Sequence, residues 1–117
     1  MARNRREVAA ELERQERRLE AEGIRARCVD IRWLNPLPVA DMVREAKATG
    51  RVLVVDECRE TGGMAEGILT ALIEGCPEVK MARVTGVDTY IPLGAAANLV
   101  LVSEADIEVA AKALVKS

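Results

Sequence analysis

The chain has 117 residues, of which half are apolar and 31% are charged, and this length fits one domain with a substantial core. A net charge of −2 provides no field that would attract a phosphate backbone, so we expect no nucleic-acid partner. The sequence has no histidine, which excludes histidine-based general-base, triad and metal chemistry for this chain acting alone.

The first segment, residues 1–23, is rich in arginine, glutamate and alanine and predicts a charged helix, because these are strong helix formers and no Gly or Pro interrupts them. Glu13 and Arg17 form a favourable pair four residues apart, and Gly23 ends the helix. Its apolar stripe is thin. The helix therefore either packs along one side with a solvated charged face, or forms a short coiled coil or partner-binding helix.

An alternation of strand and helix patterns follows Gly23. The expected elements are a strand at Ile24–Ile31, a helix at Val39–Thr49, a strand at Arg51–Asp56, a helix opened by Thr61-Gly62-Gly63 and closed by Gly75, and a strand from about Lys80 to Val84. The apolar run within Arg51–Asp56 is continuous, which indicates a central parallel strand covered on both faces. Residues 95–102 fit either a short helix or a buried strand, and one or two helical turns are the expected form. Ser103 then caps a final helix through a capping box with Asp106.

This order of elements predicts the architecture. Two strand–helix–strand crossovers imply a mostly parallel sheet with right-handed connections and helices on both faces, a three-layer α/β/α fold. We expect residues 1–117 to form a single domain, with a charged N-terminal helix at 1–23 and a parallel α/β core at 24–117. With one Trp, one Tyr and no Phe, that core must be aliphatic.

Ligands of open parallel sheets gather at the carboxyl ends of the strands, and here one such end carries Asp56 and Glu57. Two adjacent carboxylates can serve as a metal or general-base site. The alternative is structural: they accept backbone N–H groups of neighbouring loops or pair with Arg32 or Arg59. Both interpretations stay open on the sequence.

Two further features are candidate binding elements. Gly62 and Gly63 at a helix start expose amides that suit an anion, although no complete phosphate-binding motif is present, and the alternative is that they permit a tight turn and close backbone packing. Trp33, beside two prolines, is either a lid on the core of its own chain or an anchor in an interface.

The cysteines are odd in number and widely spaced, without a CxxC pair, so we expect buried free thiols in a reducing compartment. No apolar run approaches the roughly 18 residues that a membrane span needs, and the basic start leads into charged residues rather than an apolar signal core. A soluble cytoplasmic protein without membrane contact is expected.

Four segments in order resemble the C-terminal domain shared by transketolase and the β subunits of thiamine-diphosphate-dependent 2-oxo acid dehydrogenases. They are Val29-Asp30-Ile31-Arg32-Trp33-Leu34-Asn35-Pro36-Leu37, Gly50-Arg51-Val52-Leu53-Val54-Val55-Asp56-Glu57, Thr61-Gly62-Gly63-Met64-Ala65-Glu66 and Arg83-Val84-Thr85-Gly86-Val87-Asp88-Thr89-Tyr90-Ile91-Pro92. The resemblance covers about residues 20 to 115 and implies a transketolase C-terminal-domain-like fold.

The resemblance also implies a supporting role. In that family other domains hold thiamine diphosphate, with its Mg²⁺, and carry the catalytic histidines. The domain similar to this chain supports dimer assembly and, in the multienzyme complexes, docking of the acyltransferase (E2). We therefore expect no catalytic, cofactor-binding or metal residue here, and an isolated chain without activity. The full enzyme would oxidatively decarboxylate a 2-oxo acid or act as a transketolase.

Some features depart from the family pattern. The chain starts directly in its first helix, without the preceding strand, and the expectation is a fragment with an exposed sheet edge or a partner that compensates. Trp33 and the segment Pro92-Leu93-Gly94 are also unusual for the dehydrogenase β subunits. The alternative function is a free-standing anion- or nucleotide-binding regulatory module that uses the helix start at Gly62-Gly63.

Overall fold

The computed structural model describes residues 5–117, which form two compact units. One unit ends at Ile31 and the other spans Arg32–Ser117. The segment Ile24–Ile31 thus belongs with the N-terminal helix, not with the α/β core in which the sequence placed it. The expectation of a single domain over residues 1–117 stays a prediction.

The first unit is built on the charged helix α1 (Arg5–Ala21); the part of the predicted helix at residues 1–4 lies outside the described residues. Its end at Gly23 is confirmed, because Gly23 has a φ of +80° and donates its amide to the Glu20 carbonyl at 2.9 Å. The Ile24 amide donates to the Leu19 carbonyl, also at 2.9 Å, which completes a Schellman motif. The predicted i,i+4 pair is present as well, between Glu13 and Arg17.

The strand predicted at Ile24–Ile31 is wrong, since this segment has no regular secondary structure. A strand requires a ladder of backbone hydrogen bonds to a neighbour. Here the Cys28 amide instead donates to a carboxylate oxygen of Glu16 in α1, at 2.7 Å. The alternating apolar pattern of the segment predicts an extended backbone but supplies no pairing partner.

The second unit contains the other regular elements described. They are α2 (Val39–Thr49), β1 (Arg51–Arg59), α3 (Met64–Gly75), β2 (Lys80–Gly86), the 3₁₀ helix η1 (Gly94–Leu99) and α4 (Glu104–Lys116). The predicted stop of α2 is confirmed: Gly50 adopts a φ of +73° and donates its amide to the Ala46 carbonyl at 2.8 Å. The capping box of Ser103 and Asp106 at the start of α4 is also present in both directions.

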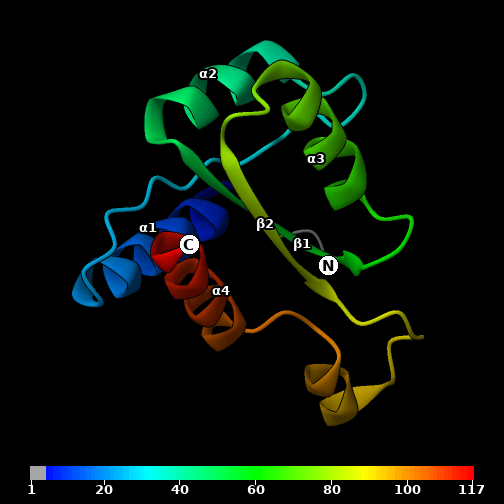
Figure 1. Ribbon diagram of the computed structural model, residues 1–117. Helices are drawn as coiled ribbons and strands as arrows, with labels where there is room; N and C mark the ends of the chain where they lie inside the picture. Colours follow the sequence, from blue (N-terminus) through cyan, green and yellow to red (C-terminus); the bar gives the residue numbers. More distant parts are fainter. Residues whose placement is uncertain (1–4) are drawn as a thin grey trace. The chain divides into compact units, whose positions relative to one another are not determined.

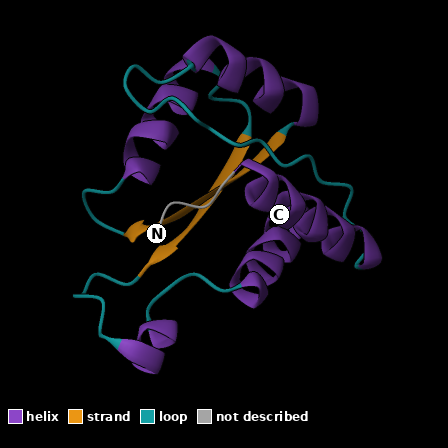
Figure 2. Cartoon of the chain, turned by 180° about the vertical axis from the view of Figure 1, so that it is seen from behind, coloured by secondary structure: helices purple, strands orange, loops and turns teal. Residues whose placement is uncertain are grey.

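The sheet consists of β1 and β2, which pair in parallel from Arg51 opposite Lys80 to Asp56 opposite Thr85. The intervening α3 lies on one face with α2 beside it, and α4 lies on the other face (Figure 1). The same arrangement appears from behind in Figure 2. The α/β class with a parallel sheet and helices on both faces is therefore confirmed.

The sheet within the described residues is smaller than predicted. It has two strands and one strand–helix–strand crossover rather than three strands and two crossovers, because Ile24–Ile31 does not pair. The prediction that Arg51–Asp56 is a central strand is consequently wrong for residues 5–117: among these, β2 is the strand with which β1 pairs, and Val55 is exposed.

The core of the second unit is aliphatic, as predicted. Its buried side chains are those of Met42, Ala46, Val54, Ala65, Ile68, Leu72, Cys76, Val79, Ala111 and Leu114.

Basic side chains connect the end of α4 to the start of the sheet, since Arg51 donates to the Leu114 carbonyl at 3.2 Å and Lys80 donates to the Ser117 carbonyl. These bonds also complement the negative end of the α4 dipole.

The three cysteines differ in exposure. Cys76 is fully buried and Cys28 is half-buried, but Cys58 is exposed, so the prediction of buried thiols is wrong for Cys58. The reason is local, since Cys58 lies in an irregular part of β1 beyond the well-paired ladder.

None of the helices within residues 5–117 is both long and apolar enough to cross a membrane.

Candidate functional site

The candidate site lies at the carboxyl ends of β1 and β2. Asp56, near the end of β1, accepts two backbone hydrogen bonds: one oxygen from the Cys58 amide at 3.0 Å and the other from the Ala65 amide at 2.9 Å. Ala65 is the second residue of α3, and the residue that precedes this helix, Gly63, has no side chain to cap it. The Asp56 carboxylate therefore supplies the missing N-cap from the strand.

Glu57 is positioned differently from its neighbour. The pairing register jumps between Asp56 opposite Thr85 and Arg59 opposite Gly86, which leaves Glu57 in a β-bulge with an exposed side chain. The two adjacent carboxylates thus have separate environments. Asp56 accepts backbone N–H groups, as the structural interpretation of the sequence predicted.

Asp56→Ala is expected to lower the free energy of unfolding by about 1–2 kcal/mol, because it removes a helix cap and leaves the Ala65 amide without its acceptor. Asp56→Asn should lose less, since its amide keeps one carbonyl oxygen as an acceptor. Urea unfolding followed by circular dichroism measures both. The matched control is Glu57→Ala, for which a change within about 0.5 kcal/mol is expected; an equal loss there would remove Asp56 from this role.

The glycine pair serves the tight turn between β1 and α3. Gly62 has a φ of +74°, a conformation that favours glycine. Gly63 has no such constraint, but a Cβ on it would lie 2.6 Å from the Arg59 carbonyl oxygen. A tight turn and close backbone packing therefore explain why glycine stands at both positions. This is the structural interpretation that the sequence left open beside anion binding.

Acidic side chains of the chain itself occupy backbone amides around this turn. They are Asp88 on Thr61 at 2.8 Å, Glu66 on Gly62 at 3.1 Å and Asp56 on Ala65 at 2.9 Å. Of the two glycine amides that the sequence offered to an anion, that of Gly62 is engaged by Glu66, and the nearby carboxylates would repel an incoming anion.

The guanidinium of Arg83, in β2, places a positive charge among these acidic side chains. Its guanidinium donates to the Glu60 carbonyl at 2.7 Å and lies 3.9 Å from a carboxylate oxygen of Glu66. The side chain is mostly covered, with 28% of its surface exposed. The turn is therefore fixed to both strands and to α3 by polar contacts.

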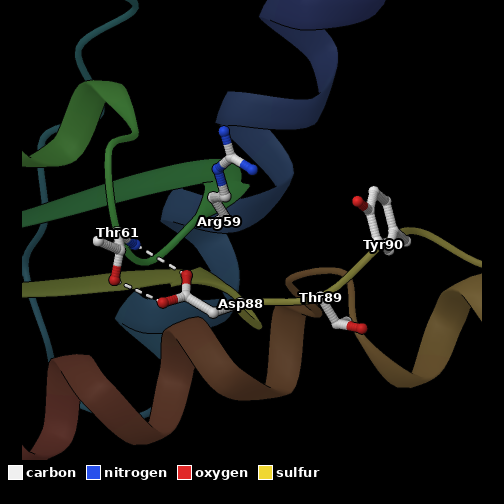
Figure 3. A pocket seen from close by; sticks show the side chains of 5 residues that line it. All are labelled: Arg59, Thr61, Asp88, Thr89 and Tyr90. Carbon is white, nitrogen blue, oxygen red and sulfur yellow. Dashed lines mark hydrogen bonds between the residues drawn. The ribbon is translucent and has the colours of Figure 1, made fainter.

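An open hollow of about 410 Å³ lies beside this turn, lined by Arg59, Thr61, Asp88, Thr89 and Tyr90. In Figure 3 the Asp88 carboxylate faces Thr61, while Arg59 and Tyr90 extend to the same side of the chain. None of the five residues singled out as candidates from the sequence lines this hollow. Sequence reasoning missed it because Thr61 and Asp88 are 27 positions apart and nothing local predicts their pairing.

Asp88 supplies a carboxylate to the lining of the hollow. Hydrogen bonds from the Thr61 hydroxyl and then from the Thr61 amide hold the pKa of Asp88 below its ordinary value. Because the pKa is depressed in the folded state, the stabilisation is complete above the unfolded-state pKa of about 3.9 and is lost as the pH falls through the lower folded value.

We predict that Thr61→Val moves the pKa of Asp88 upward, towards its ordinary value, because the hydroxyl donor is lost. Carboxyl ¹³C NMR titration of both proteins measures the change. Asp106 is the internal control, since its pKa is also lowered but by Ser103, and it should titrate identically in both. An unchanged Asp88 titration would contradict the assignment.

Trp33 lies at the start of the second unit, and 67% of its surface is exposed. This exposure weighs against a lid on the core of its own chain. The interpretation of Trp33 as an interface anchor stays a prediction.

The site as a whole defines a class of protein. Within residues 5–117 no three His, Cys, Asp or Glu side chains gather so that they could hold a metal ion. The polar groups at the strand ends bind one another and the backbone. This is a small parallel α/β domain whose strand-end loop is fixed by its own carboxylates.

The chain belongs to the transketolase C-terminal domain family, whose profile matches residues 7–108. It is 31% identical over 100 residues to the pyruvate dehydrogenase E1 component subunit beta of Bacillus subtilis, covering 82% of this chain and 31% of that protein. It is 38% identical over 74 residues to the mitochondrial 2-oxoisovalerate dehydrogenase subunit beta of Dictyostelium discoideum, covering 61% of this chain and 20% of that protein.

A third relative has a different enzyme name. The 1-deoxy-D-xylulose-5-phosphate synthase of Heliobacterium modesticaldum is 35% identical over 81 residues, covering 69% of this chain and 12% of that enzyme. The chain therefore spans less than a third of the length of each of these relatives. The family suggested by the four sequence segments is confirmed.

Proposed function

We propose that this chain is a non-catalytic assembly domain of a thiamine-diphosphate-dependent enzyme of the 2-oxo acid dehydrogenase or transketolase type. The observation that carries the proposal is the engagement of the strand-end amides by Asp56, Glu66 and Asp88. Polar groups that usually receive a ligand at this edge of a parallel sheet are here used to fix the loop. The full enzyme would oxidatively decarboxylate a 2-oxo acid.

The described residues do not fit thiamine diphosphate. A diphosphate with Mg²⁺ requires oxygen ligands for the metal and free donors for the phosphates. The described residues offer no cluster for a metal ion, and Asp56 occupies the Ala65 amide at the start of α3. We therefore propose that other parts of the full enzyme hold the cofactor.

The proposed partners are the other domains or subunits of the same enzyme, a second copy in a homodimer, and the acyltransferase of a multienzyme complex. Two relatives named as β subunits support this view, together with the small share of each relative that the chain covers. We place the assembly in the cytoplasm, with no membrane or nucleic-acid partner.

The proposal is tested by titrating the chain with thiamine diphosphate and MgCl₂ in an isothermal calorimeter. We expect no saturable heat and no turnover of pyruvate by the chain alone. The complete pyruvate dehydrogenase of Bacillus subtilis, titrated identically, is the positive control. Stoichiometric binding of the cofactor at micromolar affinity would overturn the assignment.

The alternative is a regulatory module that binds an anion or a nucleotide at the Gly62-Gly63 turn. The engaged amides weigh against it, and so does the acidic surrounding of the turn. Pyrophosphate and ATP at millimolar concentration should leave the thermal midpoint unchanged. A saturable rise in the midpoint would favour this alternative over the assembly role.

A further inference from the structure

The loop between β2 and α4, residues 88–99, has a closed and packed base. The Val87 amide donates to the Val100 carbonyl at 3.2 Å, so the chain leaves and returns at nearly the same point. Gly86, the last residue of β2, is buried, and a Cβ on it would lie 3.1 Å from the Glu57 carbonyl oxygen and 3.3 Å from that of Val100. The base of this Ω-type loop is therefore packed against β1.

The loop beyond its base is not packed. None of the residues 88–99 is buried, and the exposed fraction reaches 95% for Tyr90 and for Leu93. Figures 1 and 2 both show the loop, which includes η1, extending away from the sheet. A segment with so little buried surface opens locally at a low cost in free energy unless polar contacts hold it.

Such a contact joins the loop to the turn after β1. Both carboxylate oxygens of Asp88 accept from Thr61, Oδ1 from the amide at 2.8 Å and Oδ2 from the hydroxyl (Figure 3). Hydrogen bonds to an ionised group are roughly twice as strong as those between neutral groups. The turn that carries Thr61 is itself fixed, since Arg83 of β2 donates to the Glu60 carbonyl at 2.7 Å. Asp88 thus binds a partner that is part of the folded sheet.

We infer that these two bonds, the Thr61–Asp88 latch, hold the loop closed, and that their release lets residues 88–99 move as a unit while the sheet stays folded. None of the buried apolar side chains of the second unit lies in the loop, so its opening exposes no part of the core. The bond between Val87 and Val100 keeps the base closed when the latch opens. The latch therefore controls how the exposed side chains of the loop are presented.

Limited proteolysis with chymotrypsin tests the latch, because this protease cleaves after Tyr and Leu and acts on chain segments that have opened. We expect Asp88→Ala to raise the initial rate of cleavage after Tyr90 and Leu93 at least tenfold. Cleavage after Leu72, in the buried face of α3, should change less than twofold in the same digest. Mass spectrometry of the fragments measures both rates.

Variants of the other latch residue separate its two donors. Thr61→Val keeps the amide donor but loses the hydroxyl, so the loop should be cleaved faster than in the unmodified chain and more slowly than in Asp88→Ala. Thr61→Ser keeps both donors and should restore the unmodified rate. The matched control is Glu57→Ala, which removes an exposed carboxylate at the same end of the sheet and should leave the cleavage of the loop within twofold.

Four results would overturn the inference. They are a loop cleaved as fast in the unmodified chain as in Asp88→Ala, an equal acceleration after Leu72, an equal acceleration by Glu57→Ala, and cleavage of Thr61→Ser as fast as that of Thr61→Val. An equal acceleration after Leu72 would mean that the variant unfolds as a whole. The assembly role is tested separately, by calorimetry, and none of these four results bears on it.

Discussion

Gly63→Ala is expected to destabilise the second unit by about 2 kcal/mol, because the added methyl group has no room. The backbone of Gly63 has a φ of −87°, which alanine adopts without strain, so the cost is purely steric. The new Cβ would lie 2.6 Å from the Arg59 carbonyl oxygen and 3.2 Å from a carboxylate oxygen of Asp56. Relief of this clash displaces the carboxylate that caps α3.

Gly67→Ala provides the matched control, since Gly67 lies within α3 and a Cβ there meets no atom within 4 Å. It should stabilise the protein by about 0.5–1 kcal/mol, because alanine is the better helix former. Chemical unfolding of the two variants distinguishes them by sign. Stabilisation by Gly63→Ala would mean that the turn is not closely packed.

Leu72→Ala is expected to lower the free energy of unfolding by about 3 kcal/mol, because it removes a buried side chain and leaves a cavity. Leu72 is 2% exposed and lies on the face of α3 that also carries the buried Ala65 and Ile68. In this aliphatic core no large aromatic side chain is available to fill the space.

The next residue supplies the control for this prediction. Ile73 is 56% exposed, so Ile73→Ala should cost about 1 kcal/mol or less. Both variants should be compared by urea unfolding at the same protein concentration. If Ile73→Ala lowers the free energy of unfolding as much as Leu72→Ala does, the face of α3 that carries Ile73 is covered by a partner.

The sequence predicted most closely those elements whose limits are set locally. Gly50 ends α2 through its own positive φ, and the Ser103 capping box begins α4, so both limits agree with the structure. The continuous apolar run of β1 was equally informative, because parallel strands are covered by helices on both sides.

The errors concern contacts between distant segments. The pattern of Ile24–Ile31 cannot reveal that Glu16 binds the Cys28 amide, and the run in β1 cannot reveal that its second edge has no paired strand within residues 5–117. The same limit applies to the site. Acceptance of backbone amides by Asp56 was one of two interpretations open on the sequence, whereas the pairing of Thr61 with Asp88 depends on the fold itself.

The polar contacts of the turn after β1 have a consequence for local motion. Surface loops usually open alone, at little cost in free energy. Here the acceptors and donors come from three elements: Asp56 of β1, Arg83 of β2 and Glu66 of α3. The Thr61 and Gly62 amides themselves donate to the carboxylates of Asp88 and Glu66. The turn should behave in hydrogen exchange as part of the folded sheet rather than as an independent loop.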